Sequence, residues 1–143
     1  DSGGAGQYRV GLGIRREYLN LEDARFSIRS TKHVIAPEGA ANGGKGRTGD
    51  IIVNPETDQA KQLPTRYADY PLKGGDRFRL DTPGGGGYGN GFARDPDLVI
   101  RDLNEGYVTT EGARRDYGVV AARQGDIYVL DAPATQKARA NRG

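Results

Sequence analysis

The amino-acid sequence predicts a mainly β fold, with sheets in a barrel- or sandwich-like arrangement and two short helices near the C-terminal end. Three observations lead to this fold class. Apolar and polar residues alternate in several segments before residue 82, which is the period of strands with one buried face. Glycine fills 23 of the 143 positions, more than twice the usual share of about 7%. Helix signals come only after residue 94, so we expect residues 1–94 to be β and glycine-rich and residues 95–143 to hold the helices and the last strands.

The first predicted strands lie in residues 1–30. Residues 1–13 alternate with Tyr8, Val10 and Leu12 on one face. Residues 14–21 continue as a strand, and residues 24–30 alternate again. The intervening residues 20–23 have turn composition, so the two segments are predicted to pair as a hairpin.

Two further strand regions follow a loop over residues 37–50 that is rich in Gly, Asn and Ala. Residues 51–53 are a short apolar strand that ends at Asn54-Pro55. Residues 67–72 and 77–80 flank Lys73-Gly74-Gly75-Asp76, which supplies the glycines that a tight hairpin needs. We therefore expect these two strands to pair with each other.

The run from Thr82 to Gly91 contains four consecutive glycines. Flexible linkers combine Gly with Ser and lack aromatic residues, whereas Pro83 precedes this run and Tyr88 interrupts it. We expect ordered, polyproline-II-like backbone that packs where no Cβ would fit.

The helix signals are capping residues. Asp95 is predicted to cap a helix that begins at Pro96 and ends at Gly106. Thr110 is predicted to cap a second helix, which Gly118 terminates. Residues 119–120 and 127–130 read as short strands, and the tail from residue 132 as a short helix or frayed end. The basic residues of this part are predicted to be solvated: Arg114, Arg115, Lys137, Arg139 and Arg142.

Composition excludes several classes of function. The formal net charge is +2, with 21 basic against 19 acidic residues, so the surface is mixed and does not favour nucleic acid. The chain has no Cys, which excludes disulfides and thiolate metal sites. No stretch approaches the roughly 18 apolar residues of a membrane span. Because the chain begins Asp1-Ser2-Gly3-Gly4 and contains no Met, we expect a piece of a longer chain.

The motifs of common active sites are missing. Gly43-Gly44-Lys45-Gly46 lacks the Ser or Thr that a phosphate-binding loop needs after its Lys, so these glycines are predicted to be structural. His33 is the only histidine, and a metal site needs several convergent ligands. Tyr88 between glycines could stack on a ligand or dock on a partner, although packing on its own glycines is equally compatible. We expect no metal site and no complete catalytic site in this chain.

The ordered succession of motifs resembles the C-terminal region of the hydantoinase B family, over nearly the whole chain. The matching stretches, in order, are residues 1–18 (DSGGAGQYRVGLGIRREY), 26–30 (FSIRS), 37–39 (PEG), 43–46 (GGKG), 63–64 (LP), 73–76 (KGGD), 82–89 (TPGGGGYG), 94–96 (RDP), 107–108 (YV) and 111–120 (EGARRDYGVV).

The resemblance implies a large, cytoplasmic, multi-subunit enzyme. Members are B-type subunits of ATP-dependent N-methylhydantoinases and 5-oxoprolinases, and relatives serve acetone and acetophenone carboxylases. An A-type subunit binds ATP and Mg²⁺ and phosphorylates the small-molecule substrate, and the B-type subunit completes the reaction. The family's metal ligands, for a divalent ion, lie in an earlier part of the B-type subunit that this chain lacks. Cofactors bound by this chain alone are therefore not expected.

Three readings stay open on this basis: a hydrolase of cyclic amides, a ketone carboxylase, and a non-catalytic assembly module. The expected partners are the rest of the B-type subunit and the A-type subunit, with no nucleic acid and no membrane. His33, Tyr88 and Asp1 are the candidate contributors to a composite catalytic site, because each lies beside glycine-rich or loop backbone that a partner can approach.

Overall fold

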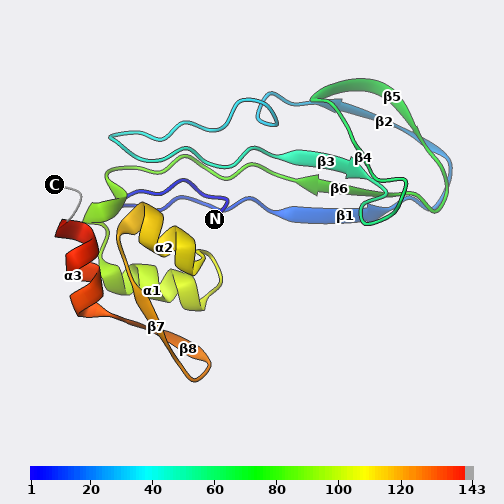
Figure 1. Cartoon of the computed structure of the whole chain (residues 1–143). Coiled ribbons are helices and arrows are strands. Elements are labelled where there is room, and N and C mark those ends of the chain that lie inside the picture. Colours follow the sequence, from blue (N-terminus) through cyan, green and yellow to red (C-terminus); the bar gives the residue numbers. More distant parts are fainter. Residues whose placement is uncertain (141–143) are drawn as a thin grey trace.

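The computed structural model describes residues 1–140, in which extended segments run side by side and the helices gather at one end (Figure 1). The strands are β1 (Arg15–Leu19), β2 (Ala24–Arg29), β3 (Asp50–Val53), β4 (Lys61–Gln62), β5 (Arg66–Leu72), β6 (Arg77–Asp81), β7 (Ala121–Gln124) and β8 (Ile127–Leu130). The helices are the 3-10 turn η1 (Gly91–Ala93), α1 (Pro96–Asn104), α2 (Thr110–Tyr117) and α3 (Ala132–Ala140). None of these helices is long and apolar enough to cross a membrane. The mainly β class is confirmed, and three short α-helices take the place of the expected two.

The strands form antiparallel sheets whose pairing differs from the prediction. One sheet has the order β1-β6-β3-β4, and β2-β5 and β7-β8 are two-stranded. Neither predicted hairpin exists, because β1 pairs with β6 and β2 pairs with β5. Alternation identifies a strand and its buried face, but it does not select the partner strand. Within residues 1–140 the strands do not close into a barrel.

The two turns that were predicted to close hairpins instead pack against each other where the chain passes between the two sheets. The backbone N–H of Asn20 donates to the carbonyl oxygen of Asp76 at 2.8 Å, and that of Gly75 donates to Asn20 at 2.7 Å. The ammonium group of Lys73 lies 2.6 Å from the carboxylate of Asp23. These contacts hold the β1–β2 connection and the β5–β6 connection together at the same end of the sheets.

The first hydrophobic core lies between the four-stranded sheet and the β2-β5 pair. In β3, Ile51 and Val53 are buried whereas Ile52 is partly exposed, as a strand with one covered face requires. Phe78 of β6 stacks on Tyr18 and also contacts Phe26 of β2, with ring centroids 4.7 and 5.1 Å apart. The buried members of this core are Ile28, Ile51, Val53, Leu63 and Leu72.

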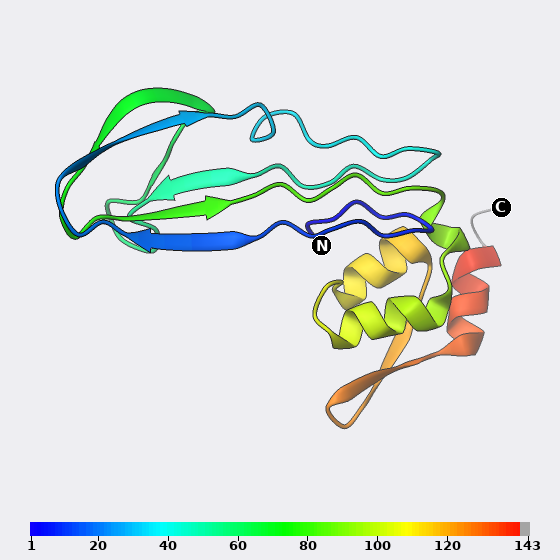
Figure 2. The same cartoon turned by 180° about the vertical axis from the view of Figure 1, so that it is seen from behind.

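The glycine-rich segments, residues 1–13, 37–49 and 82–90, lie side by side beyond this sheet (Figure 2). Backbone hydrogen bonds connect them: the N–H of Gly44 donates to Ala5 at 2.7 Å, and that of Gly87 donates to Gly44 at 2.9 Å. The predicted strand over residues 1–13 is wrong, since only Tyr8 forms an isolated bridge there, with Tyr88. Gly4, Gly6 and Gly13 approach other backbone segments closely instead of forming a regular ladder.

The close approach of these backbones explains the glycine content. A Cβ atom at any of three glycines of the run would overlap a backbone carbonyl oxygen. The overlapping pairs are Gly84 with Ser2, Gly86 with Glu38, and Gly87 with Ala5. A side chain at these positions would force the backbones apart. Their polyproline-II conformation stays a prediction.

The helices begin and end at the predicted residue types, with small shifts. Asp95 caps α1 by accepting a hydrogen bond from the N–H of Asp97 at 2.9 Å. Thr109 caps α2, one residue earlier than predicted, and Gly118 ends it in the left-handed region with φ 62°. The strand predicted at residues 119–120 is displaced, because β7 begins only at Ala121.

A second core lies among the helices, with Val99, Val108, Ala113, Tyr117 and Val119 as its buried members. The C-terminal helix α3 packs there through polar side chains. Thr135 is buried, and its hydroxyl oxygen accepts from the N–H of Val120 at 2.9 Å. The prediction that Arg139 is solvated is wrong, because its guanidinium donates to the carbonyl oxygens of Tyr117 at 3.1 Å and Arg94 at 2.7 Å. Arg142 lies outside the described residues.

Candidate functional site

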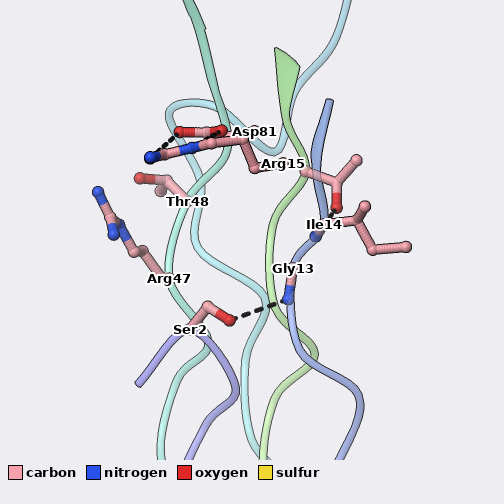
Figure 3. A pocket seen from close by; sticks show the side chains of 8 residues that line it. Ser2, Gly13, Ile14, Arg15, Arg47, Thr48 and Asp81 are labelled. Atoms are coloured by element: carbon pink, nitrogen blue, oxygen red, sulfur yellow. Dashed lines mark hydrogen bonds and ion pairs between the residues drawn. The ribbon is translucent and has the colours of Figure 1, made fainter. Parts of the chain in front are cut away.

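An open hollow of about 250 Å³ lies where the N-terminal segment meets the ends of the central strands (Figure 3). Four segments that are far apart in sequence contribute to it. Its lining residues are Ser2, Gly13, Ile14, Arg15, Arg47, Thr48, Asp81 and Thr82. Five of these eight side chains carry a hydroxyl or a guanidinium group, and one carries a carboxylate, so the lining consists mostly of hydrogen-bond donors.

A bidentate ion pair forms one wall of the hollow. Arg15 of β1 and Asp81 of β6 are directly opposite in the strand register, and the guanidinium donates to both carboxylate oxygens at 2.8 Å. This hydrogen bonding lowers the pKa of Asp81 and raises the pKa of Arg15. Nε of Arg79 lies 3.6 Å from the same carboxylate. Asp81 is therefore already neutralised by its own neighbours.

Two hydroxyl groups of the hollow accept hydrogen bonds from backbone N–H groups. The Ser2 oxygen accepts from the N–H of Gly13 at 2.9 Å, and the Thr82 oxygen accepts from the N–H of Ile14 at 2.8 Å. Because each hydroxyl also carries one donor hydrogen, both groups can still donate. No general base accepts the Ser2 proton in the described part of the chain, so the geometry favours binding rather than nucleophilic attack.

Arg47 differs from the other arginine of the hollow. Its backbone is fixed on both sides, since its N–H donates to Ser2 at 2.8 Å and its carbonyl accepts from Gly84 at 3.1 Å. Its side chain is exposed, and among residues 1–140 the guanidinium has no hydrogen-bond or ion-pair partner. Figure 3 shows it on the same side as Thr48 and the Arg15–Asp81 pair. The hollow thus contains one guanidinium group that forms no hydrogen bond or ion pair and is attracted to Asp81 only over a longer distance.

The three residues that the sequence suggested lie in different places. The Asp1 carboxylate accepts from the backbone N–H and the hydroxyl of Thr109, at 3.0 and 2.6 Å, and so connects the N-terminus to the start of α2. His33 lies in a turn beside Gly49, and its Nδ1 is buried without a partner.

Tyr88 is 54% exposed, and its ring centroid lies 6.2 Å from that of Tyr8. Throughout the described ranges, no hydrogen bond or ring contact joins any two of Asp1, His33 and Tyr88. The structure therefore does not assemble them into one site within this chain.

The sequence analysis missed a buried ion cluster at the junction with the helices. The Asp102 carboxylate, 1% exposed, accepts from Arg9 at 3.0 Å and from Arg94 at 2.9 Å. The Arg9 guanidinium also lies 4.9 Å from the centroid of the Tyr107 ring. The position of Asp102 in the sequence could have revealed this cluster, because Asp102 lies on the same apolar face of α1 as Val99. A charge on such a face indicates a buried partner.

Metal binding finds no support in the described residues. Over residues 1–140, no group of three or more His, Cys, Asp or Glu side chains is placed to hold a metal ion. The divalent metal that the family resemblance implies therefore has no ligand set among these residues, and no reaction step is assigned to it.

The family model described as Hydantoinase B/oxoprolinase matches residues 1–91. An uncharacterised protein of Methanocaldococcus jannaschii is 40% identical over 140 residues, which is 97% of this chain and 24% of that protein. The caprolactamase subunit beta of Pseudomonas jessenii is 35% identical over 148 residues, which is 98% of this chain and 24% of that subunit.

Two solved structures share the fold. The crystal structure of the ATP-dependent caprolactamase from Pseudomonas jessenii matches with a TM-score of 0.79 and 30% identity, over 98% of this chain and 24% of that chain. Nucleotide-free acetone carboxylase matches with a TM-score of 0.76 over 99% of this chain and 23% of that chain, and at 23% identity this likeness shows the fold alone. The chain spans about a quarter of the length of these proteins.

Proposed function

The chain belongs to the hydantoinase B/oxoprolinase family, and from that premise we propose that it is the C-terminal part of a B-type subunit in an ATP-dependent hydrolase of cyclic amides. The observation that carries this proposal is its similarity, along 98% of its length, to a subunit of caprolactamase. The named substrate of that relative, a lactam, is a cyclic amide, as hydantoins and 5-oxoproline are.

In this proposal the chain acts after substrate activation. An A-type subunit binds ATP and Mg²⁺ and phosphorylates the cyclic amide, and the B-type subunit completes hydrolysis. The described residues hold no nucleophile hydrogen-bonded to a general base and no metal ligand set, so this chain supplies side chains to a composite site at most. Asp1, His33 and Tyr88 remain the proposed contributors, each from a different segment.

The glycine-rich segments have a proposed structural role. Ordered polyproline-II-like backbones would hold the N-terminal segment, residues 37–49 and residues 82–90 at distances that side chains forbid. The backbone hydrogen bonds between them and the positions where a Cβ would overlap a carbonyl oxygen support this role.

The proposed activity is tested on the purified complex that contains this chain. With ATP and Mg²⁺ we expect opening of a hydantoin, 5-oxoproline or caprolactam ring, with one ADP released per ring opened. Ring opening by the isolated 15.4 kDa chain without ATP would contradict the proposal. A His33→Ala variant adds a second readout: loss of an acid–base group costs about 10²–10⁴-fold in product formation, while ATP turnover by the A-type subunit stays measurable.

The alternative is a ketone carboxylase, which the similarity to the acetone carboxylase alpha subunit of Xanthobacter autotrophicus, 30% identical over 96% of this chain and 19% of that subunit, favours. The two activities differ in their second substrate, because a carboxylase requires bicarbonate and a hydrolase requires water. ATP-dependent consumption of acetone or acetophenone that depends on bicarbonate would select this alternative. If product formation is unchanged in the Asp1, His33 and Tyr88 variants, this chain is an assembly module within either enzyme.

A further inference from the structure

We propose that the hollow between the N-terminal segment and the ends of β1 and β6 binds an oxyanion, a phosphate or a carboxylate, through the guanidinium of Arg47. The hydroxyl groups of Ser2, Thr48 and Thr82 are its additional donors. The existence of this binding site does not depend on the proposed enzymatic activity.

The first support is the charge balance of the lining. The hollow is lined by two guanidinium groups and one carboxylate, and Arg15 donates hydrogen bonds to both oxygens of that Asp81 carboxylate. Asp50, beside Asp81 in the strand register, has its carboxylate bound to the Gln62 amide. Arg15, Arg79 and Arg47 all act on the one Asp81 carboxylate. Arg47 is the one of them without a hydrogen bond or ion pair, and an anionic ligand would balance the excess positive charge.

The second support is an excess of donors over acceptors. The oxygens of Ser2 and Thr82 already accept backbone N–H groups, so what each hydroxyl still offers is its hydrogen. The Thr48 hydroxyl has no hydrogen-bond partner in the described ranges. Several donors that converge on one space, with the only carboxylate already engaged, match the oxygen atoms of a phosphate or carboxylate better than a neutral ligand.

The third support is the fixed backbone under these groups. Arg47 is held by hydrogen bonds to two separate segments, through Ser2 on one side and Gly84 on the other. Gly13 is closely packed as well, since a Cβ there would overlap the carbonyl oxygen of Thr82. The backbone under these donors therefore does not need to reorganise on binding, which reduces the entropy that binding costs.

The reaction of the proposed enzyme would supply two kinds of oxyanion to this site. This identification of the ligand rests on the proposed function. ATP-dependent activation yields phosphate or a phosphorylated substrate, and hydrolysis of a cyclic amide yields a carboxylate. Inorganic phosphate and 6-aminohexanoate, the ring-opened form of caprolactam, represent the two sources as probes. Tighter binding of one probe decides between the sources.

The test is equilibrium titration of the complete chain with each probe at low ionic strength, where surface charges are least screened. Arg47→Gln removes the unpaired cation without breaking an ion pair, and Thr48→Val removes a hydroxyl at constant shape. Arg101→Gln is the matched control, because Arg101 is an exposed arginine on α1 outside the hollow. Circular dichroism spectra that superpose establish that all three variants are folded.

We expect Arg47→Gln to weaken binding of the preferred probe by about tenfold or more, the size of one lost charge-assisted hydrogen bond. Thr48→Val should weaken it less, and Arg101→Gln should not change it. Equal binding by wild type, Arg47→Gln and Arg101→Gln, or no binding of either probe, would overturn the site. The titration measures binding and needs no turnover. If binding depends on Arg47 but the complex opens no ring, the binding site is supported and the proposed function is contradicted.

Discussion

The glycine-rich segments (residues 1–13, 37–49 and 82–90) and the helical region (residues 96–140) are held together by different means. In the first region, segments approach so closely that the carbonyl oxygens of Ser2, Glu38 and Ala5 occupy the space where glycine Cβ atoms would be. In the second region, Val99 and Val119 are completely buried among the helices, as in an ordinary side-chain core. A chain with a mean hydropathy of −0.73 and 23 glycines can therefore order part of its length by backbone contacts.

The two regions meet at the ion cluster of Arg9, Asp102 and Arg94. Arg9 belongs to the glycine-rich N-terminal segment, and Asp102 belongs to α1, so this buried charge pair connects elements that are 93 residues apart. Arg94 reinforces the junction by donating to the Gln7 carbonyl at 3.1 Å. Substitutions in each region and at the junction are expected to act through different physical causes.

The largest effect is expected where backbone packing has no alternative. In Gly86→Ala the new methyl group would overlap the Glu38 carbonyl oxygen, and no side-chain rotation can relieve this. We expect a loss of more than about 4 kcal/mol in the free energy of unfolding, measured by urea denaturation. Gly11→Ala is the control, because no atom lies within 4 Å of its Cβ position, and it should stay within about 1 kcal/mol of wild type. Equal stability of the two variants would mean that close backbone contact does not hold this region.

The second largest effect is expected at the junction. Asp102→Asn keeps the shape of the side chain but leaves Arg9 and Arg94 without their counter-charge in a buried position. Breaking a buried ion pair costs about 3–5 kcal/mol, which thermal and chemical denaturation can measure. Glu105→Gln, an exposed acid at the end of the same helix, should change stability by less than about 0.5 kcal/mol. Similar results for both variants would show that the junction does not depend on the Asp102 charge.

An intermediate effect is expected in the side-chain core. Val99→Ala removes two fully buried methyl groups, and the lost transfer energy together with a small cavity amounts to about 2 kcal/mol. Leu98→Ala, a larger truncation at a neighbouring position that is 37% exposed, should cost less. The opposite order in urea denaturation would contradict the assignment of the second core.

The smallest effect concerns pH and the Arg15–Asp81 pair. Arg15 lowers the pKa of Asp81 in the folded chain, so this carboxylate stabilises the fold at pH values above its unfolded pKa of about 3.9. That contribution is lost as the pH falls through the lower folded pKa. The difference in urea midpoint between wild type and Asp81→Asn should therefore be largest near neutral pH and shrink below about pH 4. A difference that is constant from pH 7 to pH 3 would show that the Asp81 charge does not contribute.

Prediction from the sequence succeeded where a short stretch of residues contains the whole signal. Asp95 followed by Pro96 specifies the start of α1, and Gly118 specifies the end of α2, because capping is satisfied within one turn of helix. The ordered motifs also identified the family correctly. The candidate site was not predictable in the same way, since its lining combines Ser2, Arg15, Arg47 and Asp81 from four separate segments.

The sequence by itself determined the mainly β character, the helix boundaries to within a residue or two, and membership of the hydantoinase B/oxoprolinase family. Only the tertiary structure decided that β1 pairs with β6, that Arg139 donates to the carbonyl oxygens of Tyr117 and Arg94, and that Arg47 forms no hydrogen bond or ion pair. The physical reason is the range of the interactions. Strand period and helix capping act over a few residues, whereas strand pairing and charge neutralisation depend on which distant segments come into contact.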